Sequence, residues 1–440
     1  MSPTRRILGL ASGVGIVAAN MIGAGVFLSA GFMVQDMGPG TLLLAWLVGA
    51  FLALAGCRAY ASVARLVPRS GGEYRYLSEL LHPALGYLAG WASLLVGFSA
   101  PVAVDAVASG AFAATLAPGL DARGVGAGLI VTLTALHAAG LQLSKWTQDG
   151  LVAAKAILVL GFVAVGLALG HNQWPTWSPP HAGPGFPLPA FMGSLFFIAF
   201  AFSGWNAAAY AAEEFKDPER DVPRAMLIGC SLVAVLYLLV NWVFVANLTP
   251  ARASVVFEYE TSRVTLGHLV MRDIVGEAGA KVMSGFVIVA LVSSMSAMTF
   301  AGPRVYAAMA GDGFLPRALV GRAGQPPVWA IALQGAIALV IVYVHEISQA
   351  IQNVGAILTL FAALTALSLF RARALGRDAR LLPPVSLAAA AVYGAAAAWM
   401  LYFGFRGRTH LLLWLALIAL AALAAYALTP QRADRANRLQ

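Results

Sequence analysis

Long apolar runs separated by short polar segments make up most of the chain. A run of about 18 or more apolar residues can cross a hydrocarbon core of about 30 Å. Lipid offers the backbone no hydrogen-bond partners, so each run is predicted to be an α-helix. The pattern predicts an all-α integral membrane protein of about twelve transmembrane helices, at residues 7–35, 40–66, 84–116, 122–143, 147–170, 190–213, 222–248, 278–308, 326–344, 347–371, 382–404 and 409–428.

The polar segments between these runs predict loops and one amphipathic helix. Residues 70–83 are too polar and too short to span, and they are predicted to form an amphipathic helix on the inner side. Residues 171–189, rich in Pro, Gly and Trp, are predicted to form an outer loop, and the mixed-charge residues 249–277 a longer outer excursion. Residues 311–325 form an inner linker, and the tail after 429 is polar.

Composition agrees with the membrane prediction. The chain is 60% hydrophobic and only 11% charged, whereas a soluble domain carries about 25% charged residues. The net charge of +9 comes from basic residues that punctuate the apolar runs, so it does not indicate a nucleic-acid partner. The lipid bilayer is the partner that this composition predicts.

Lysine and arginine positions predict the orientation. With a cytoplasmic N-terminus, about 20 of these residues fall on the inner side and about 7 on the outer side. We therefore expect a multi-pass protein of the plasma (inner) membrane with both termini in the cytoplasm. Arg5 and Arg6 before an apolar stretch imitate a signal peptide, but many further spans follow.

Two of the predicted spans contain helix-breaking sequences. Span 1 carries Gly13, Gly15, Gly23 and Gly25, and span 6 carries Ser203-Gly204 near its middle. Interrupted segments at equivalent places in two halves of a membrane protein indicate a transporter binding site. The free N–H and C=O groups of half-helix ends suit a zwitterionic amino acid. The alternative is that these small residues permit close helix packing, and for Gly13 and Gly15 that alternative stays open.

Three motifs carry a resemblance to a known family. The first is IGAGVF at residues 22–27, similar to the family's IGxGIF in span 1. The second is FSGWN at 202–206, followed by Tyr210, Glu213, Glu214, Pro218, Arg220 and PRA at 223–225. The third is PRVYAAMAGDGFLP at 303–316, after span 8. With these motifs the chain resembles the amino acid–polyamine–organocation superfamily, and within it bacterial relatives of the L-type amino acid transporters.

The resemblance implies a LeuT-type fold that works by alternating access. Ten core helices would form two inverted five-helix repeats, at residues 7–170 and 190–371, with spans 1 and 6 broken. Two peripheral helices would follow at 382–428. The whole chain, 1–440, would be one transmembrane transporter domain.

The resemblance also implies which residues bind the substrate. Backbone groups of span 1 would meet the carboxylate, at Ile22, Gly23, Ala24 and Gly25. Span 6 would offer carbonyls to the ammonium and line the pocket, at Phe200, Ala201, Ser203 and Gly204. Phe200 matches the family's aromatic gate over the substrate.

This chain departs from the family pattern in three places. Ala24 stands where many relatives have a hydroxyl residue, so carboxylate binding would rest on backbone amides. Gly311 replaces an arginine, which weakens the expectation of inner-gate salt bridges. The loop near Asp121 has no cysteine, so no disulfide-linked ancillary subunit is expected.

Lys155 lies well inside predicted span 5, where a charge costs about 2.5–3.5 kcal/mol to insert. The resemblance implies a fixed cation in place of the sodium ion of sodium-coupled relatives. It would bridge spans 1 and 8 through the backbone near Gly13–Gly15 and the hydroxyl of Ser293 or Ser294. The alternative is that Lys155 extends to the cytoplasmic interface.

Three acidic residues are further candidates. Asp105 in span 3 could take part in proton coupling or be a structural acid near the outer end. Glu213 and Glu214 end span 6, either as a solvated helix end or as an inner gate that pairs with Arg58 or Arg304.

The function that these features favour is Na⁺-independent transport of neutral L-amino acids, by exchange or with protons. A cationic amino acid or polyamine carrier and a non-transporting amino acid sensor are the alternatives. The sequence contains no Walker loop, no HExxH motif and no nucleophile elbow, and Cys57 and Cys230 have no metal-ligand spacing. We therefore expect no enzyme activity, no cofactor and no metal site.

Overall fold

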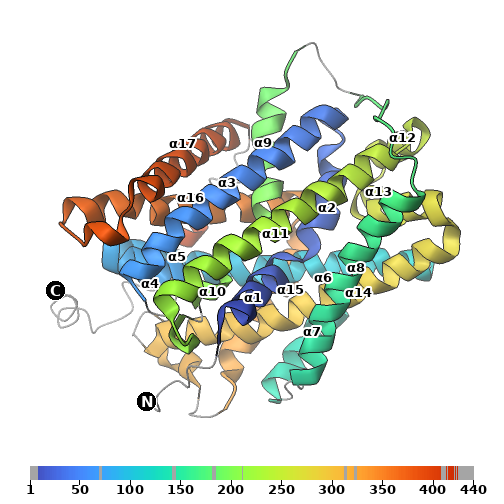
Figure 1. The fold of residues 1–440 in the computed structure, drawn as a ribbon. Helices are drawn as coiled ribbons and strands as arrows, with labels where there is room; N and C mark the ends of the chain where they lie inside the picture. Colours follow the sequence, from blue (N-terminus) through green and yellow to red (C-terminus); the bar gives the residue numbers. More distant parts are fainter. Residues whose placement is uncertain are drawn as a thin grey trace.

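The computed structural model describes residues 8–68, 72–140, 145–180, 185–210, 212–311, 315–321, 325–407, 413, 415–420, 422 and 424. Within these residues the regular structure is helical, apart from one isolated bridge between Leu8 and Phe215. The long helices pack side by side in one bundle (Figure 1). The prediction of an all-α protein is confirmed for this part of the chain.

The first half of the chain follows the predicted spans, with two interruptions. Its helices are α1 (Leu10–Met21), α2 (Ala24–Met33), α3 (Pro39–Leu66), α4 (Gly72–Leu80), α5 (Pro83–Ala92), α6 (Ser99–Leu116), α7 (Ala122–Ala138) and α8 (Lys145–Leu169). Helix α4 is the amphipathic helix predicted in the polar segment. Between α5 and α6 the span contains a π-helical turn, Ser93–Phe98, which the hydrophobic pattern did not predict.

The second half adds α9 (Leu188–Ala201), α10 (Ala207–Tyr210), α11 (Pro218–Asn247), α12 (Pro250–Glu258), α13 (Glu260–Val264), α14 (Leu266–Gly311), α15 (Val328–Val344), α16 (Ile347–Ala374) and α17 (Pro384–Gly407). The segment 249–277, predicted to be an outer excursion, contains α12, α13 and the start of α14. Thr249 caps α12 by accepting a hydrogen bond from the Arg252 N–H, and Pro250 occupies its first turn. The predicted span at 409–428 lies largely outside the described residues.

Several of these helices suit a bilayer. Within the part of the chain that the structure describes, seven helical stretches are long and apolar enough to cross a membrane, and four shorter apolar helices lie among them. This supports a multi-pass membrane protein. The count of twelve spans and the division into two inverted repeats remain predictions.

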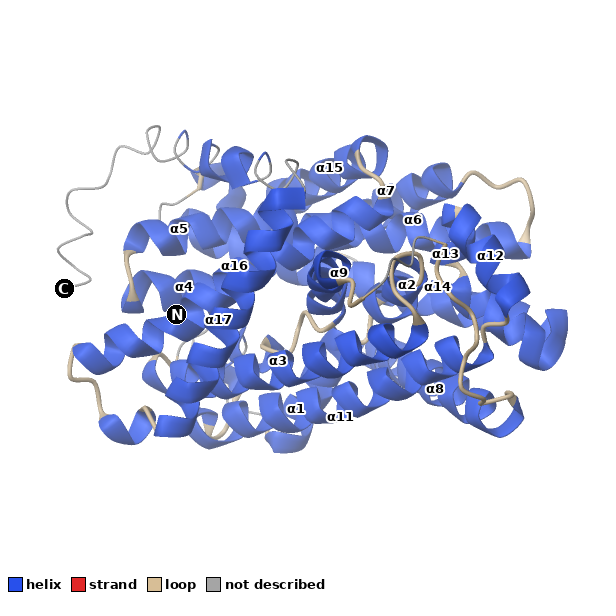
Figure 2. Cartoon of the chain, turned by 90° about the horizontal axis from the view of Figure 1, so that it is seen from above, coloured by secondary structure: helices blue, strands red, loops and turns tan. Residues whose placement is uncertain are grey.

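Helix α9 lies in the middle of the bundle, surrounded by other helices (Figure 2). Three glycines from three helices bring their backbones against it: Gly25 of α2, Gly49 of α3 and Gly355 of α16. A Cβ atom added at any of them would come within 2.4 Å of an atom of α9. Small residues thus allow three helices to approach α9 closely, as is usual where membrane helices pack.

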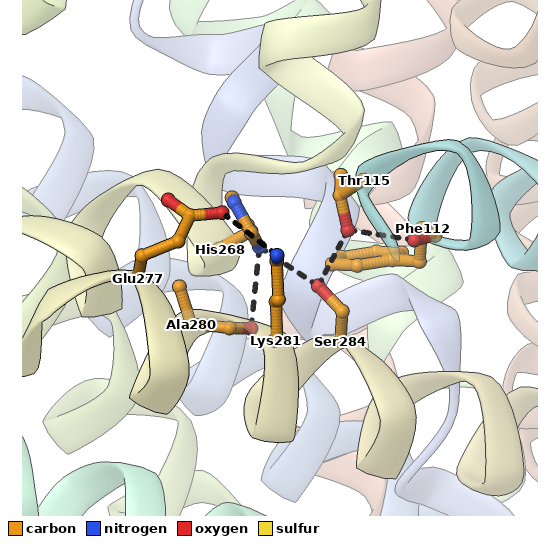
Figure 3. Close-up of polar contacts among 7 residues, drawn as sticks. All are labelled: Phe112, Thr115, His268, Glu277, Ala280, Lys281 and Ser284. Carbon is orange, nitrogen blue, oxygen red and sulfur yellow. Dashed lines mark hydrogen bonds and ion pairs between the residues drawn. The ribbon is translucent and has the colours of Figure 1, made fainter. Parts of the chain in front are cut away.

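A polar cluster joins α6 to α14 where α14 begins (Figure 3). The Thr115 hydroxyl of α6 lies 2.9 Å from the Ser284 hydroxyl of α14, which lies 2.9 Å from Nδ1 of His268. Lys281 and Glu277 form an ion pair of 3.9 Å beside them. The buried polar groups thus serve as hydrogen-bond partners for one another. The cluster links two helices that also carry residues of the candidate site.

Candidate functional site

Spans 1 and 6 are both interrupted in the structure. Helix α1 ends at Met21, Ile22 and Gly23 are extended, and α2 begins at Ala24. Helix α9 ends at Ala201, and residues 202–206 form turns before α10. The prediction of broken helices is confirmed, but the break in span 1 is shorter than the predicted 22–25, because Ala24 and Gly25 are already helical.

The two breaks lie next to each other. The Tyr237 hydroxyl of α11 lies 2.6 Å from the Met21 carbonyl and 3.2 Å from the Ala201 carbonyl, the last helical residues of α1 and α9. Gly204 has φ +97°, and a Cβ there would lie 2.9 Å from the carbonyl carbon of Asn20. Sequence reasoning missed Tyr237, because nothing in its own span distinguishes it from a packing residue.

A cavity of about 480 Å³ begins at the break in span 6. This volume lies in the range typical of small-molecule sites. Among the predicted site residues, Ser203, Gly204 and Glu214 line the cavity. Its walls also include parts of the break, α3, the π-helical turn and α16, at Asn20, Gly49, Ala53, Ser93, Gly97, Phe202, Trp205, Asn206 and Ile357.

The other predicted substrate-binding residues are not among those that line this cavity. Ile22, Ala24, Phe200 and Ala201 are buried, with at most 7% of their surface exposed, and they are not among the described residues that line the cavity. The Phe200 carbonyl accepts a hydrogen bond from the Ser203 N–H at 3.0 Å. The roles of Phe200 as a gate and of these carbonyls as ammonium acceptors remain predictions.

Lys155 and Asp105 are buried ionisable residues of neighbouring helices, near the break in span 1. Their exposed fractions are 4% and 2%. The electrostatic surroundings of the Asp105 carboxyl include the Lys155 ammonium, the Ser294 hydroxyl and the Ala24 N–H. Asp105 of α6 therefore has neighbouring polar groups on α8, on α14 and at the first residue of α2. The pairing of Asp105 with Lys155 did not follow from the sequence, where the two residues belong to different spans.

The glycines predicted beside Lys155 have different surroundings. A Cβ at Gly13 would lie 2.7 Å from atoms of Ala225 and Phe215, so Gly13 serves close packing. A Cβ at Gly15 would meet nothing within 4 Å. Gly23 instead faces Ser294, whose Oγ would lie 3.5 Å from an added Cβ. Ser293 is buried in the same turn of α14.

The end of span 6 contains the predicted gate residues. Glu213 and Glu214 belong to a 3₁₀ turn, Ala212–Glu214, and the Glu213 side chain lies outside the described part of the structure. Glu214 and Arg304 both line the cavity. The described residues show no ion pair between Glu214 and either Arg58 or Arg304. The Arg304 guanidinium lies 3.3 Å from the ring centre of Phe300.

A carboxylate that sequence reasoning missed lies in the same cavity wall. Glu73, at the start of α4, accepts hydrogen bonds from Tyr60 at 3.0 Å, Asn206 at 2.6 Å and Tyr210 at 2.5 Å. One feature of the sequence could have identified Glu73. It is an acidic residue near the beginning of the predicted amphipathic helix, directly after two glycines.

Comparison with known proteins identifies the class of the chain. The family model for amino acid permeases matches residues 8–424. The chain is 25% identical over 381 residues to the b(0,+)-type amino acid transporter 1 of Mus musculus, covering 84% of this chain and 77% of the relative. It is 27% identical over 330 residues to the large neutral amino acids transporter small subunit 2 of Homo sapiens, covering 72% and 59%.

A third relative, the Asc-type amino acid transporter 1 of Mus musculus, is 28% identical over 265 residues, or 56% of this chain and 48% of that protein. These relatives are transporters and not enzymes, which agrees with the expectation from the sequence. The family model covers most of the chain, and the resemblance inferred from the three motifs is confirmed. The chain therefore belongs to the amino acid permease family, within the amino acid–polyamine–organocation superfamily.

Proposed function

We propose that this permease carries neutral L-amino acids by alternating access, independently of Na⁺, by exchange or together with a proton. The observation that carries the proposal is the junction of the two helix breaks at the cavity. The carbonyl ends of α1 and α9 lie within reach of one hydroxyl, that of Tyr237, and the cavity begins at Ser203 and Gly204. Half-helix ends of this kind provide acceptors for an ammonium and donors for a carboxylate.

The composition of the cavity wall supports a neutral substrate. Next to the break the wall is apolar, with Leu52, Ala53, Ile357 and Phe361 among its residues. The carboxylate of Glu73 reaches the break through Asn206, but it is already bonded to three donors. The name of one relative refers to large neutral amino acids. A substrate side chain without charge fits these surroundings best.

The buried pair of Lys155 and Asp105 supports Na⁺ independence. An ammonium has three donors and needs no bound ion to satisfy nearby acceptors. The Asp105 carboxyl lies in the electrostatic surroundings of this ammonium and of the N-terminus of α2, at Ala24. In the proton-coupled form of the proposal, Asp105 is the group that gains and loses the proton.

For the cellular setting, we propose the plasma membrane with both termini in the cytoplasm and no disulfide-linked ancillary subunit. The distribution of basic residues and the absence of cysteine near Asp121 support this. A cysteine placed in the tail after residue 429, probed with an impermeant reagent on intact cells and on inside-out vesicles, tests the orientation. Labelling on intact cells would contradict it.

Counterflow in proteoliposomes tests the transport proposal. Vesicles loaded with each common amino acid in turn should accumulate the same labelled amino acid for a set of neutral substrates, with or without Na⁺ and with or without a pH gradient. Accumulation of only lysine, arginine or polyamines would favour the cationic carrier. Binding by the purified protein without any counterflow would favour the sensor.

A further inference from the structure

Glu73 ties three parts of the molecule together through its carboxylate. Oε1 accepts from the Tyr60 hydroxyl of α3 at 3.0 Å and from the Asn206 amide, in the break of span 6, at 2.6 Å. Oε2 accepts from the Tyr210 hydroxyl of α10 at 2.5 Å. Hydrogen bonds to an ionised acceptor are stronger than neutral ones. Both oxygens of Glu73 are therefore committed, and two of the three donors belong to the second part of the broken span.

The backbone before Glu73 is shaped to receive one of these donors. Gly72 has φ +58°, a conformation that favours glycine. A Cβ at this position would lie 1.9 Å from Cε1 of Tyr210. Gly72 thus lets the Tyr210 ring lie directly against the start of α4, where its hydroxyl reaches Glu73.

Helix α4 is anchored on other helices. It packs against α5 and α16, whereas α10 is a single helical turn that follows the break. The bonds of Glu73 therefore run from an anchored helix to the short segment whose position sets the shape of the cavity. Glu73, Asn206 and Tyr210 all line that cavity, and its wall is exposed at Ala301 and Arg304.

We propose that Glu73 is a positioning residue for transport, a latch that holds α10 against α4 while the cavity is open at Ala301. Release of Asn206 and Tyr210 from Glu73 accompanies closure of this side. The proposal rests on the alternating-access function proposed above. In this proposal the linker between spans 2 and 3 takes part in opening and closing the cavity. The linker is not proposed to contact the substrate.

Thiol labelling tests the latch without any substrate. A cysteine at Ala301 is labelled with a membrane-impermeant maleimide on vesicles that present the Arg304 side, and the parent protein, whose Cys57 and Cys230 are buried, gives the background. Tyr210→Phe removes one charge-assisted hydrogen bond and keeps the ring. We expect it to slow labelling by roughly 10-fold, because the open state loses stability.

The control is Tyr76→Phe on α4. The buried Tyr76 hydroxyl has no hydrogen-bond partner within the described chain, so its removal should leave the labelling rate unchanged. Glu73→Gln keeps a carbonyl oxygen for Tyr60 and Asn206 and should slow labelling less than Glu73→Ala. In a double-mutant cycle, adding Tyr210→Phe to Glu73→Ala should change the rate no further.

Labelling of the Tyr210→Phe variant at the parental rate, or faster, would overturn the latch, as would equal slowing by Tyr76→Phe. Additive effects of Glu73→Ala and Tyr210→Phe would also overturn it. Failure of the transport proposal has a different signature. In that case no amino acid shows counterflow in the parent protein, whatever the labelling rates of the variants.

Discussion

The Tyr237 hydroxyl contacts the last carbonyls of both interrupted helices, and its ring packs edge-on against Trp46. Tyr237→Phe keeps the ring and removes the hydrogen bonds. We expect a loss of about 0.5–1.5 kcal/mol in the free energy of unfolding and a larger relative loss of uptake, because the two breaks lose their common contact. Thermal melting in detergent and uptake by proteoliposomes measure both quantities.

The matched control for Tyr237→Phe is Tyr306→Phe. Tyr306 is also fully buried, but its hydroxyl has no hydrogen-bond partner in the described structure. This variant should melt and transport like the parent. Equal behaviour of the two variants would show that the Tyr237 hydroxyl does not join the breaks.

Lys155 shows how a neighbour changes the expectation for a mutation. A buried lysine considered by itself costs free energy, so its removal alone would leave folding largely intact. Beside Asp105, however, the substitution leaves a buried carboxylate without its cation. We now expect Lys155→Met to destabilise the protein by about 3–5 kcal/mol, and the double variant Lys155→Met/Asp105→Asn to recover most of that loss.

Chemical denaturation or thermal melting of the single and double variants checks this expectation. The recovery should appear in stability and not in transport, because the Lys155 ammonium is missing from both proteins. A double variant no more stable than Lys155→Met would mean that the two side chains do not compensate each other.

At the scale of single elements, the break in span 6 depends on Gly204. Gly204→Ala places a side chain at φ +97° and within 2.9 Å of the backbone of Asn20. Gly185 in the loop before α9 has a similar φ of +95° but open space around it. Comparing the two alanine variants therefore separates backbone strain from the close approach of span 1.

Both substitutions should lower the unfolding free energy by about 1–3 kcal/mol through strain. Only Gly204→Ala should also abolish counterflow, because Asn20 and the break must move apart. Retained counterflow in a folded Gly204→Ala variant would show that the contact between the breaks is not needed.

Helix boundaries were predictable where the sequence carries a specific signal. The breaks at 22–23 and 202–206 followed from glycine in otherwise apolar spans. No helix was predicted at α12 although Thr249-Pro250 is a helix-start signature, because the mixed charge of the segment indicated only an excursion outside the membrane. The π-helical turn was not predictable, since the residues around it are mostly apolar. The spacing of apolar and polar positions therefore shows no shift where the helix widens.

At the scale of the whole molecule, uptake should not depend on sodium. Wild-type uptake of a neutral amino acid should be the same in NaCl and in choline chloride, because the Lys155 ammonium is part of the protein. Initial rates in proteoliposomes under the two salts provide the measurement. Loss of uptake in choline would contradict the replacement of sodium by Lys155.

The variant Lys155→Met/Asp105→Asn provides the control for the sodium experiment. It should slow uptake in both salts, because the anchor at the N-terminus of α2 is gone. Sodium-stimulated uptake in this variant alone would indicate that removal of the ammonium opens a site for the ion.

The candidate site was predictable only in part. The sequence places Gly23 and Ser203–Gly204 in two separate spans, and the family resemblance brought them together. The cavity itself also needs Gly49, Ser93 and Glu73, which lie on three further elements. Their contributions depend on how helices distant in sequence pack, and no periodicity within one span contains that information.

The π-helical turn at Ser93–Phe98 has a consequence for comparing this permease with its relatives. Hydrogen bonds from residue i to i+5, in place of i+4, accommodate one residue more than an α-helical turn. Because the wider turn absorbs that residue, deleting it and restoring α geometry would leave α5 and α6 nearly in phase. Ala89 and Ala92 would then keep their places in the cavity wall, whereas Ser93 and Gly97 within the turn would change theirs. A relative one residue shorter at this point would share the helices on both sides of the turn and differ in the side chains of the turn itself.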